Sequence, residues 1–341
     1  MKIKEEFNKI TETLNSDYGL IVLKNNKLIY EKYKNNNRKS RFRIFSGTKI
    51  ITALAIMILI DQNKLKITDT INKFGINIPN SERITILHLL NHTSGIFDIY
   101  LELYVKLNLM EYLHIKSGSS GLIEFKTIIE ILNNNKPYFA PIRNPYKTGI
   151  KYYNNTGYDI LGYIIYKVSK LIPGDYIRIN IFEKLDMRHS GFQIDNHKDE
   201  CISYENKKEI GIKAQQNWYC ANAFIVCSLL DYGKFVNGYK KLINSKTLDI
   251  YNKLYFFKDY KKGSKTYKRL GHQGGGDFAH NHIIKKEEYY PITRTIIQHY
   301  ENNKDKITII MSENYQNTNG FFSNNYKNWS ELWFKLDSFV F

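Results

Sequence analysis

The chain has 341 residues, 43% of them hydrophobic, which is enough apolar material for a sizeable core and excludes an intrinsically disordered protein. Lys and Arg number 50 against 33 Asp and Glu, so the formal net charge is +17. Because the lysines are scattered among Asn, Ile and Tyr along the whole chain and no binding motif accompanies them, we expect no nucleic-acid partner.

The cysteines and the apolar runs indicate where the protein resides. Cys201, Cys220 and Cys227 lack C-x-x-C spacing, so neither a disulfide framework nor a zinc ribbon is predicted. The first ten residues alternate charge with single apolar residues, which is typical of an amphipathic helix and not of a signal peptide. The most apolar run, residues 50–60, is about half the length that a bilayer span needs. We expect a cytoplasmic protein without a membrane span, and the oligomeric state stays open.

Strand and helix signals follow the N-terminal helix. Residues 18–23 and 27–33 are β-rich runs separated by Asn25-Asn26, which favours a hairpin because asparagine tolerates positive φ. Helices are predicted from Ser46 to about Asn63, over 84–91 and, most clearly, over 158–170, where apolar residues share one face. Residues 295–300 and 306–311 predict two further strands, and 325–336 a closing helix.

Strands at both ends around a helical middle predict an α+β fold: an antiparallel sheet flanked by helices and built from both termini, with an inserted, mainly helical lobe. We expect a single domain over residues 1–341, with its sheet lobe at about 1–66 and 210–341 and its helical lobe at about 67–209.

Three segments carry chemistry. Ser46 and Lys49 form a Ser-x-x-Lys pair at a predicted helix start, where residues three apart share a face and a lysine of lowered pKa can activate the hydroxyl. Alone the pair is weak, because Ser46 could simply cap the helix. Tyr153 and Asn155 form a Tyr-x-Asn, in which a phenol held near a lysine could act as phenolate and an amide could hold a substrate carbonyl.

The third segment is Leu270-Gly271-His272-Gln273-Gly274-Gly275-Gly276. Its glycines let a strand edge approach a ligand, with backbone N–H groups free to stabilise an oxyanion. A flexible turn is an alternative, and a phosphate loop is disfavoured because no helix follows.

Ser-x-x-Lys, Tyr-x-Asn and His-x-Gly in this order resemble the three active-site motifs of the serine β-lactamase and penicillin-binding-protein superfamily, closest to class C β-lactamase-related serine hydrolases. The stretches 84–95, 155–165 and 231–235 are also similar to that family, and the resemblance covers about residues 18–314.

The resemblance implies a β-lactamase/transpeptidase-like fold and acyl transfer through Ser46, without cofactor or metal, on a small-molecule or peptide substrate. Lys49 and Tyr153 would share the base and acid roles, Asn155 would bind substrate, and the N–H groups of Ser46 and Gly275 would form the oxyanion hole. Of the His-x-Gly segment, Gly274 and Gly275 would border the substrate, together with His272.

Several residues depart from the family pattern. His272 stands where many β-lactamases have lysine, and because imidazole is a weaker anchor for a carboxylate, ester or peptide cleavage is favoured over efficient penicillin hydrolysis. Ala223-Phe224 replaces a usual Gly-Gly pair, and extra sequence follows Gly276. The region 96–141 matches poorly and is expected to contribute substrate-contacting loops.

Other patterns resemble functional motifs but do not predict functional sites. Lys147-Thr148-Gly149 spells a β-lactamase motif out of order and is rejected. His88 and His92, four apart on a predicted helix, are expected in the core or beside the site because no glutamate follows His88. A metal site at His280 and His282 is disfavoured, since no acidic or cysteine partner is near. Cys220 and Cys227, two helical turns apart, are expected in the core.

Two function classes remain. The favoured one is a serine hydrolase acting on a small ester, amide or D-amino-acid peptide, because Ser46, Lys49, Tyr153 and Asn155 are all present. The alternative is a catalytically silent relative that binds a ligand or partner in the same cleft.

Overall fold

The computed structural model describes residues 2–12, 17–99, 125–146, 153–192, 204–205, 208–209, 221–223, 225–262, 264–276 and 292–315. The expected closing helix at 325–336, the Lys147-Thr148-Gly149 triplet, Cys220 and the pair His280 and His282 lie outside these residues.

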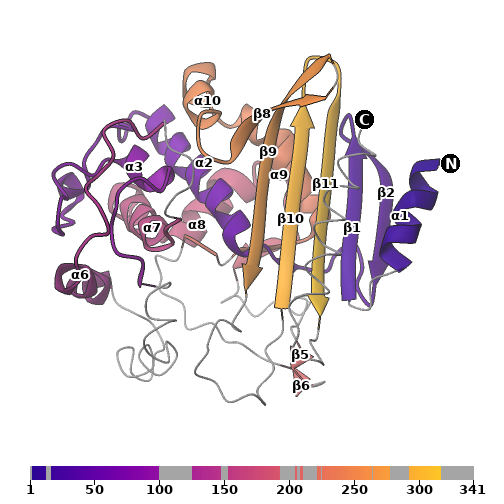
Figure 1. The fold of residues 1–341 in the computed structure, drawn as a ribbon, viewed down its shortest axis with the longest axis horizontal. Coiled ribbons are helices and arrows are strands. Elements are labelled where there is room, and N and C mark those ends of the chain that lie inside the picture. The colour runs from indigo at the N-terminus through magenta and orange to yellow at the C-terminus, as the bar shows by residue number, and fades with distance from the viewer. Residues whose placement is uncertain are drawn as a thin grey trace.

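The centre of the molecule is a six-stranded antiparallel sheet in the order β2-β1-β11-β10-β9-β8 (Figure 1). The N-terminal and C-terminal parts of the sheet meet where β1 pairs with β11, with Ile21 opposite Ile310. The fold class is therefore confirmed: α+β, with an antiparallel sheet built from both terminal parts of the chain. The strands are β1 (Asp17–Lys24), β2 (Lys27–Lys34), β8 (Phe257–Lys262), β9 (Lys265–Gly276), β10 (Ile292–Glu301) and β11 (Lys306–Tyr315).

Both faces of the sheet carry buried side chains. Because successive side chains of a strand point to opposite faces, strand β1 contributes to two separate clusters. Leu20 and Val22 of β1 form a buried cluster with Phe7 of helix α1 (Lys2–Glu12). Ile21 and Leu23 belong to the larger core on the other face, shared with helix α9 (Leu229–Gly238).

Helix α2 (Thr48–Asp61) is the centre of the larger core, and its residues from Thr48 to Leu59 are all buried. A helix that is apolar on every side is stable only when protein surrounds it. Figure 1 shows the other helices of the middle of the chain gathered beside the sheet around α2. The helical elements of this middle part are η2 (Ile71–Phe74), α3 (Ile86–Leu90), α6 (Phe125–Asn134), α7 (Thr156–Ser169), α8 (Pro173–Ile177) and η4 (Arg178–Phe182), of which α7, α8 and η4 contact α2.

Smaller elements complete the described structure. A second sheet has the order β3-β7-β4, and β5 pairs with β6. No helix among the described residues is long and apolar enough to cross a membrane. These elements are β3 (Phe42–Arg43), β4 (Ser190–Phe192), β5 (Tyr204–Glu205), β6 (Lys208–Glu209), β7 (Ile225–Cys227), η6 (Tyr239–Lys241) and α10 (Ser245–Tyr251).

Two local expectations were wrong. Ser46 does not begin an α-helix: it lies in a 3₁₀ turn, η1 (Phe45–Gly47), and α2 starts at Thr48. Cys227 lies in strand β7 and not in a helix, although its side chain is fully buried in the core as expected.

Candidate active site

A strained turn presents Ser46. Phe45, directly before it, has φ of 43°, a left-handed conformation that costs a non-glycine residue of order 1–3 kcal/mol and is commonest at functional sites. Gly47, directly after it, packs so closely on Tyr232 that a Cβ atom there would lie 2.7 Å from the phenol oxygen. The turn packs against strand β9, which brings the serine beside the glycine-rich segment.

Lys49 is fully buried in the first turn of α2, and its ammonium nitrogen has three oxygen partners. Nζ lies 3.1 Å from Oγ of Ser46, 2.9 Å from Oδ1 of Asn155 and 2.8 Å from the carbonyl oxygen of Asn222. Burial lowers the pKa of Lys49 to about 7, and the charges of Asp159 and Asp98 partly oppose this fall. The amine is therefore within reach of the serine proton and is able to exist unprotonated near neutral pH.

Tyr153 lies on the other side of the amine, with its ring centroid 4.9 Å from Lys49 Nζ. Burial raises the pKa of Tyr153, and the nearby Ser46 hydroxyl opposes the rise without reaching hydrogen-bond geometry. The phenolate form that the sequence allowed is disfavoured, because a buried phenol keeps its proton. In this setting Tyr153 is suited to donate a proton and not to remove one.

Asn155 precedes α7 and is held from both ends of its side chain. Its Oδ1 accepts from Lys49, whereas its backbone N–H and its Nδ2 donate to Oδ2 of Asp98 over 2.8 and 3.3 Å. On the far side of the amine, Nδ2 of Asn222 donates to Oδ1 of Asp159 over 2.8 Å. Both carboxylates are almost completely buried.

Sequence reasoning missed Asp98, Asp159 and Asn222. Only Asp159 carried a signal, because it lies in the first turn of α7, four residues after Asn155, which directly precedes this helix. Asp98 and Asn222 reach the site from loops, and no spacing rule connects them with Lys49.

His272 and the glycines border the site from strand β9. The Nε2 atom of His272 lies 3.1 Å from the hydroxyl of Tyr255, whose ring stands edge-on to the imidazole. Gly274 and Gly275 pair with Thr295 and Arg294 of β10, so their backbone forms part of the extended strand beside η1.

The histidine pair of the helical lobe is explained without a metal. His88 lies in α3, where its Nδ1 is 2.7 Å from the Thr85 hydroxyl in a capping box, and its Nε2 is 2.8 Å from the carbonyl oxygen of Ile142. His92 does not share that helix, because α3 ends at Leu90. The Nδ1 of His92 accepts from the backbone N–H of Asn154.

The structure thus brings Ser46, Lys49, Tyr153 and Asn155 together, although their positions in the sequence span more than one hundred residues. A hydroxyl, an amine of lowered pKa and a proton-holding phenol at one point are the components that acyl transfer needs.

Comparison with known proteins identifies the family of the chain. A model of the Beta-lactamase family matches residues 14–279. The putative penicillin-binding protein PbpX of Bacillus subtilis is 31% identical over 161 residues, which are 47% of this chain and 35% of that protein. The match spans less than half of the length of the curated relatives.

Solved structures share the fold at low identity. The octameric penicillin-binding protein homologue from Pyrococcus abyssi superposes with a TM-score of 0.64 at 20% identity, over 94% of this chain and 74% of that chain. The D-amino acid amidase from Ochrobactrum anthropi SV3 superposes with a TM-score of 0.64 at 15% identity, over 91% and 90%. Because the family model matches well over half of the sequence, the conclusion is direct: the chain belongs to the Beta-lactamase family of serine β-lactamase and penicillin-binding-like proteins.

Proposed function

We propose that the protein is a serine hydrolase that works through an acyl-enzyme on Ser46. The observation that carries the proposal is the Lys49 amine, which is buried, has a pKa of about 7 and lies 3.1 Å from the serine oxygen. An ordinary surface lysine is protonated at neutral pH and is unable to accept the serine proton.

In the first step the Ser46 oxygen attacks the substrate carbonyl as its proton passes to Lys49. The carbonyl oxygen takes up the electron pair, and the backbone N–H groups of Ser46 and Gly275 stabilise the negative charge, an interaction worth about 3 kcal/mol per donor. When the intermediate collapses, the bond to the leaving group breaks, and Tyr153 delivers a proton to that group while Lys49 restores the phenol. A water molecule then attacks the acyl carbonyl as its proton passes to Lys49, and the bond to the Ser46 oxygen breaks as Lys49 returns that proton to the serine.

We propose that the substrate is a small ester, an amide or a D-amino-acid peptide. Asn155 presents its amide beside the nucleophile, where it would contact the substrate, and His272 supplies an imidazole in place of a fixed positive charge. The structural likeness to a D-amino acid amidase supports this class over an efficient β-lactamase.

Turnover of a panel of chromogenic esters, D-alanyl peptides and a cephalosporin tests the proposal. We expect hydrolysis of at least one ester or D-alanyl peptide, and its loss in Ser46→Ala, because among the described residues Ser46 is the one whose hydroxyl contacts Lys49. Ser169→Ala, which removes an exposed hydroxyl at the end of α7, is the matched control and should leave the rate unchanged. A folded protein that turns over nothing on the panel would instead favour the catalytically silent alternative.

A further inference from the structure

Two buried carboxylates lie near the Lys49 amine, and each is separated from it by one asparagine residue. Asp98 contacts Asn155, whose Oδ1 accepts from Lys49, and Asp159 contacts Asn222, whose carbonyl oxygen also accepts from Lys49. We propose that Asp98 and Asp159 are positioning residues that hold these two asparagines against the amine and supply the negative charge with which the amine carries the Ser46 proton. The inference rests on the proposed function and deepens it.

The contacts of the amine fix the direction of its lone pair. An unprotonated amine has two N–H bonds and one lone pair, and the oxygens of Asn155 and Asn222 occupy the two N–H bonds. The lone pair is thereby left for the third neighbour, Oγ of Ser46. The two amide contacts therefore decide which way the base points.

Asp98 fixes the orientation of the first amide. A carboxylate only accepts hydrogen bonds, so the Asn155 side chain must turn its NH2 group to Asp98 and its oxygen to Lys49. The second Asp98 oxygen accepts from the Thr156 hydroxyl over 3.4 Å, which anchors the carboxylate at the start of α7.

The two carboxylates also supply negative charge beside the amine. Taking the serine proton turns a buried neutral amine into a buried cation, which is costly without nearby negative charge. Burial alone lowers the pKa of Lys49, and Asp159 and then Asp98 raise it again. The amine can then both accept a proton and release it.

Three other titratable side chains beside Lys49, those of His92, Tyr153 and Tyr158, are uncharged at neutral pH. Burial holds the pKa of His92 well below its usual range, with Lys49 and His272 acting in the same direction, so the imidazole is neutral. Burial raises the pKa values of Tyr153 and Tyr158, whose rings lie 4.9 and 5.6 Å from Nζ, so both phenols are neutral too.

The direct test is a titration of Lys49 by NMR on the full chain labelled with [13Cε]lysine, its signal assigned by its absence in Lys49→Met. We expect a midpoint near pH 7 in the unaltered protein. Asp98→Asn and Asp159→Asn should each lower the midpoint by roughly one pH unit, because each removes one nearby opposite charge. The acid limb of kcat/KM should move in the same direction.

Thr156→Val is the matched control. It disturbs the Asp98 site by removing a hydroxyl that contacts Asp98 and accepts from the Ile99 N–H, yet it keeps the charge. Its midpoint should equal that of the unaltered protein even if its rate falls.

The results of the titration distinguish the role of the two carboxylates from the proposed hydrolase function. If Asp98→Asn does not fold, Asp159→Asn decides alone, because it acts from α7 through Asn222. Unmoved midpoints in folded carboxylate variants would overturn the positioning role, whatever the turnover. Shifted midpoints in a protein without turnover would support the charge role and count against the proposed function.

Discussion

Two histidines of the candidate active site differ in their surroundings. His92 packs among aromatic rings, with centroids 4.4 Å from Tyr153 and 4.5 Å from Tyr255, and its lowered pKa keeps it neutral. His272 lies in the glycine-rich strand β9, where its Nε2 is 3.1 Å from the hydroxyl of Tyr255. His92 is therefore suited to support the Tyr153 ring, and His272 to meet a substrate.

A lysine at position 272 should change substrate preference. If His272 faces the substrate, His272→Lys places a permanent charge against a substrate carboxylate, and the rate of acylation by penicillin should rise about tenfold relative to an uncharged ester, since a charge-assisted hydrogen bond is stronger by about 1.4 kcal/mol. Stopped-flow acylation with both reagents measures the ratio. Tyr255→Phe, which removes the hydroxyl but keeps the imidazole, should leave the ratio as it is. An unchanged ratio in His272→Lys would rule out the anchoring role.

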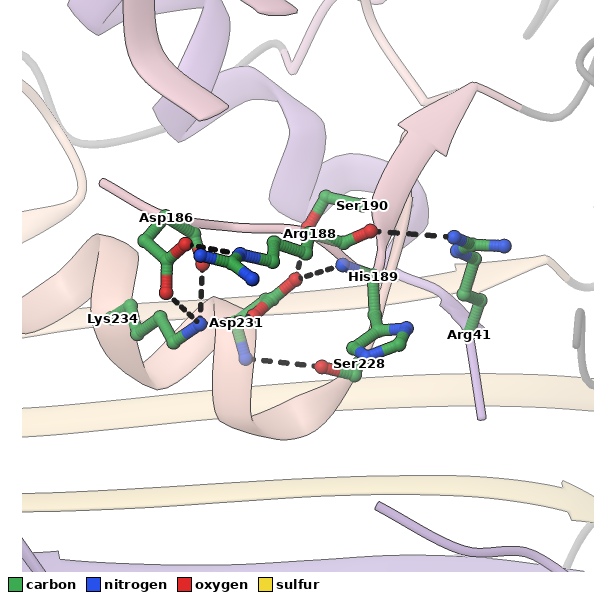
Figure 2. Close-up of polar contacts among 8 residues, drawn as sticks. All are labelled: Arg41, Asp186, Arg188, His189, Ser190, Ser228, Asp231 and Lys234. Carbon is green, nitrogen blue, oxygen red and sulfur yellow. Dashed lines mark hydrogen bonds and ion pairs between the residues drawn. The ribbon is translucent and has the colours of Figure 1, made fainter. Parts of the chain in front are cut away.

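At the scale of elements, the start of α9 is fastened to the second sheet by one carboxylate. Figure 2 shows Asp231 in contact with His189, Ser190 and Lys234. Its Oδ2 accepts from the His189 backbone N–H over 2.6 Å and from the Ser190 hydroxyl over 3.1 Å, and Oδ1 lies 3.0 Å from the Lys234 ammonium. The family-like segment 231–235 thus has a structural reason, which is to join α9 to β4.

Asp231→Asn should lower the free energy of unfolding by about 2 kcal/mol, because hydrogen bonds to a buried charged acceptor are lost. Lys234→Gln, at a side chain that is 40% exposed, should cost less than about 1 kcal/mol. Urea unfolding followed by circular dichroism measures both. Equal losses in the two variants would show that the ion pair, and not the buried carboxylate, holds the junction.

The same scale shows what the sequence could predict. The hairpin β1–β2 was predicted from Asn25 and Asn26, and both adopt positive φ, 51° and 67°. Helices α2 and α7 were also predicted, because long apolar or one-faced patterns are strong signals. Strand β8 was missed, since Phe257-Lys-Asp-Tyr-Lys-Lys is polar at most positions, as an edge strand often is.

The residues of the candidate site were also predicted only in part from the sequence. The order of three motifs predicted Ser46, Lys49, Tyr153 and Asn155, and the geometry of the described residues brings these four together. Their roles stay predictions. The carboxylates behind them could not be predicted, because a contact such as Asp98 with Asn155 depends on tertiary packing and leaves no periodic pattern.

At the scale of the whole molecule, one core connects the sheet with the helical part. A single buried cluster runs from Ile21 and Ile310 of the sheet through Leu54 of α2 to Leu161 of α7. We propose that the sheet lobe and the helical lobe form one domain, because neither closes its own apolar surface.

Leu161→Ala, which empties space in that shared core, should lower the free energy of unfolding by about 2–5 kcal/mol. Circular dichroism and probe labelling of Ser46 should be lost together as urea rises, because one core unfolds as one unit. Separate transitions for the two signals would show that the lobes are independent domains.

The central claim is that Lys49 removes the Ser46 proton, and the rate of covalent modification by a fluorophosphonate, followed by intact mass and peptide mapping as pH is varied, tests it most directly. We predict one adduct, on Ser46, whose rate of formation rises with pH through about 7, because a base must be unprotonated to act and the pKa of Lys49 is about 7. Lys49→Arg, whose guanidinium keeps its proton, should react roughly a hundredfold more slowly, whereas Lys64→Arg on the surface should react normally. An adduct on another residue, or an equal rate in Lys49→Arg, would contradict the account.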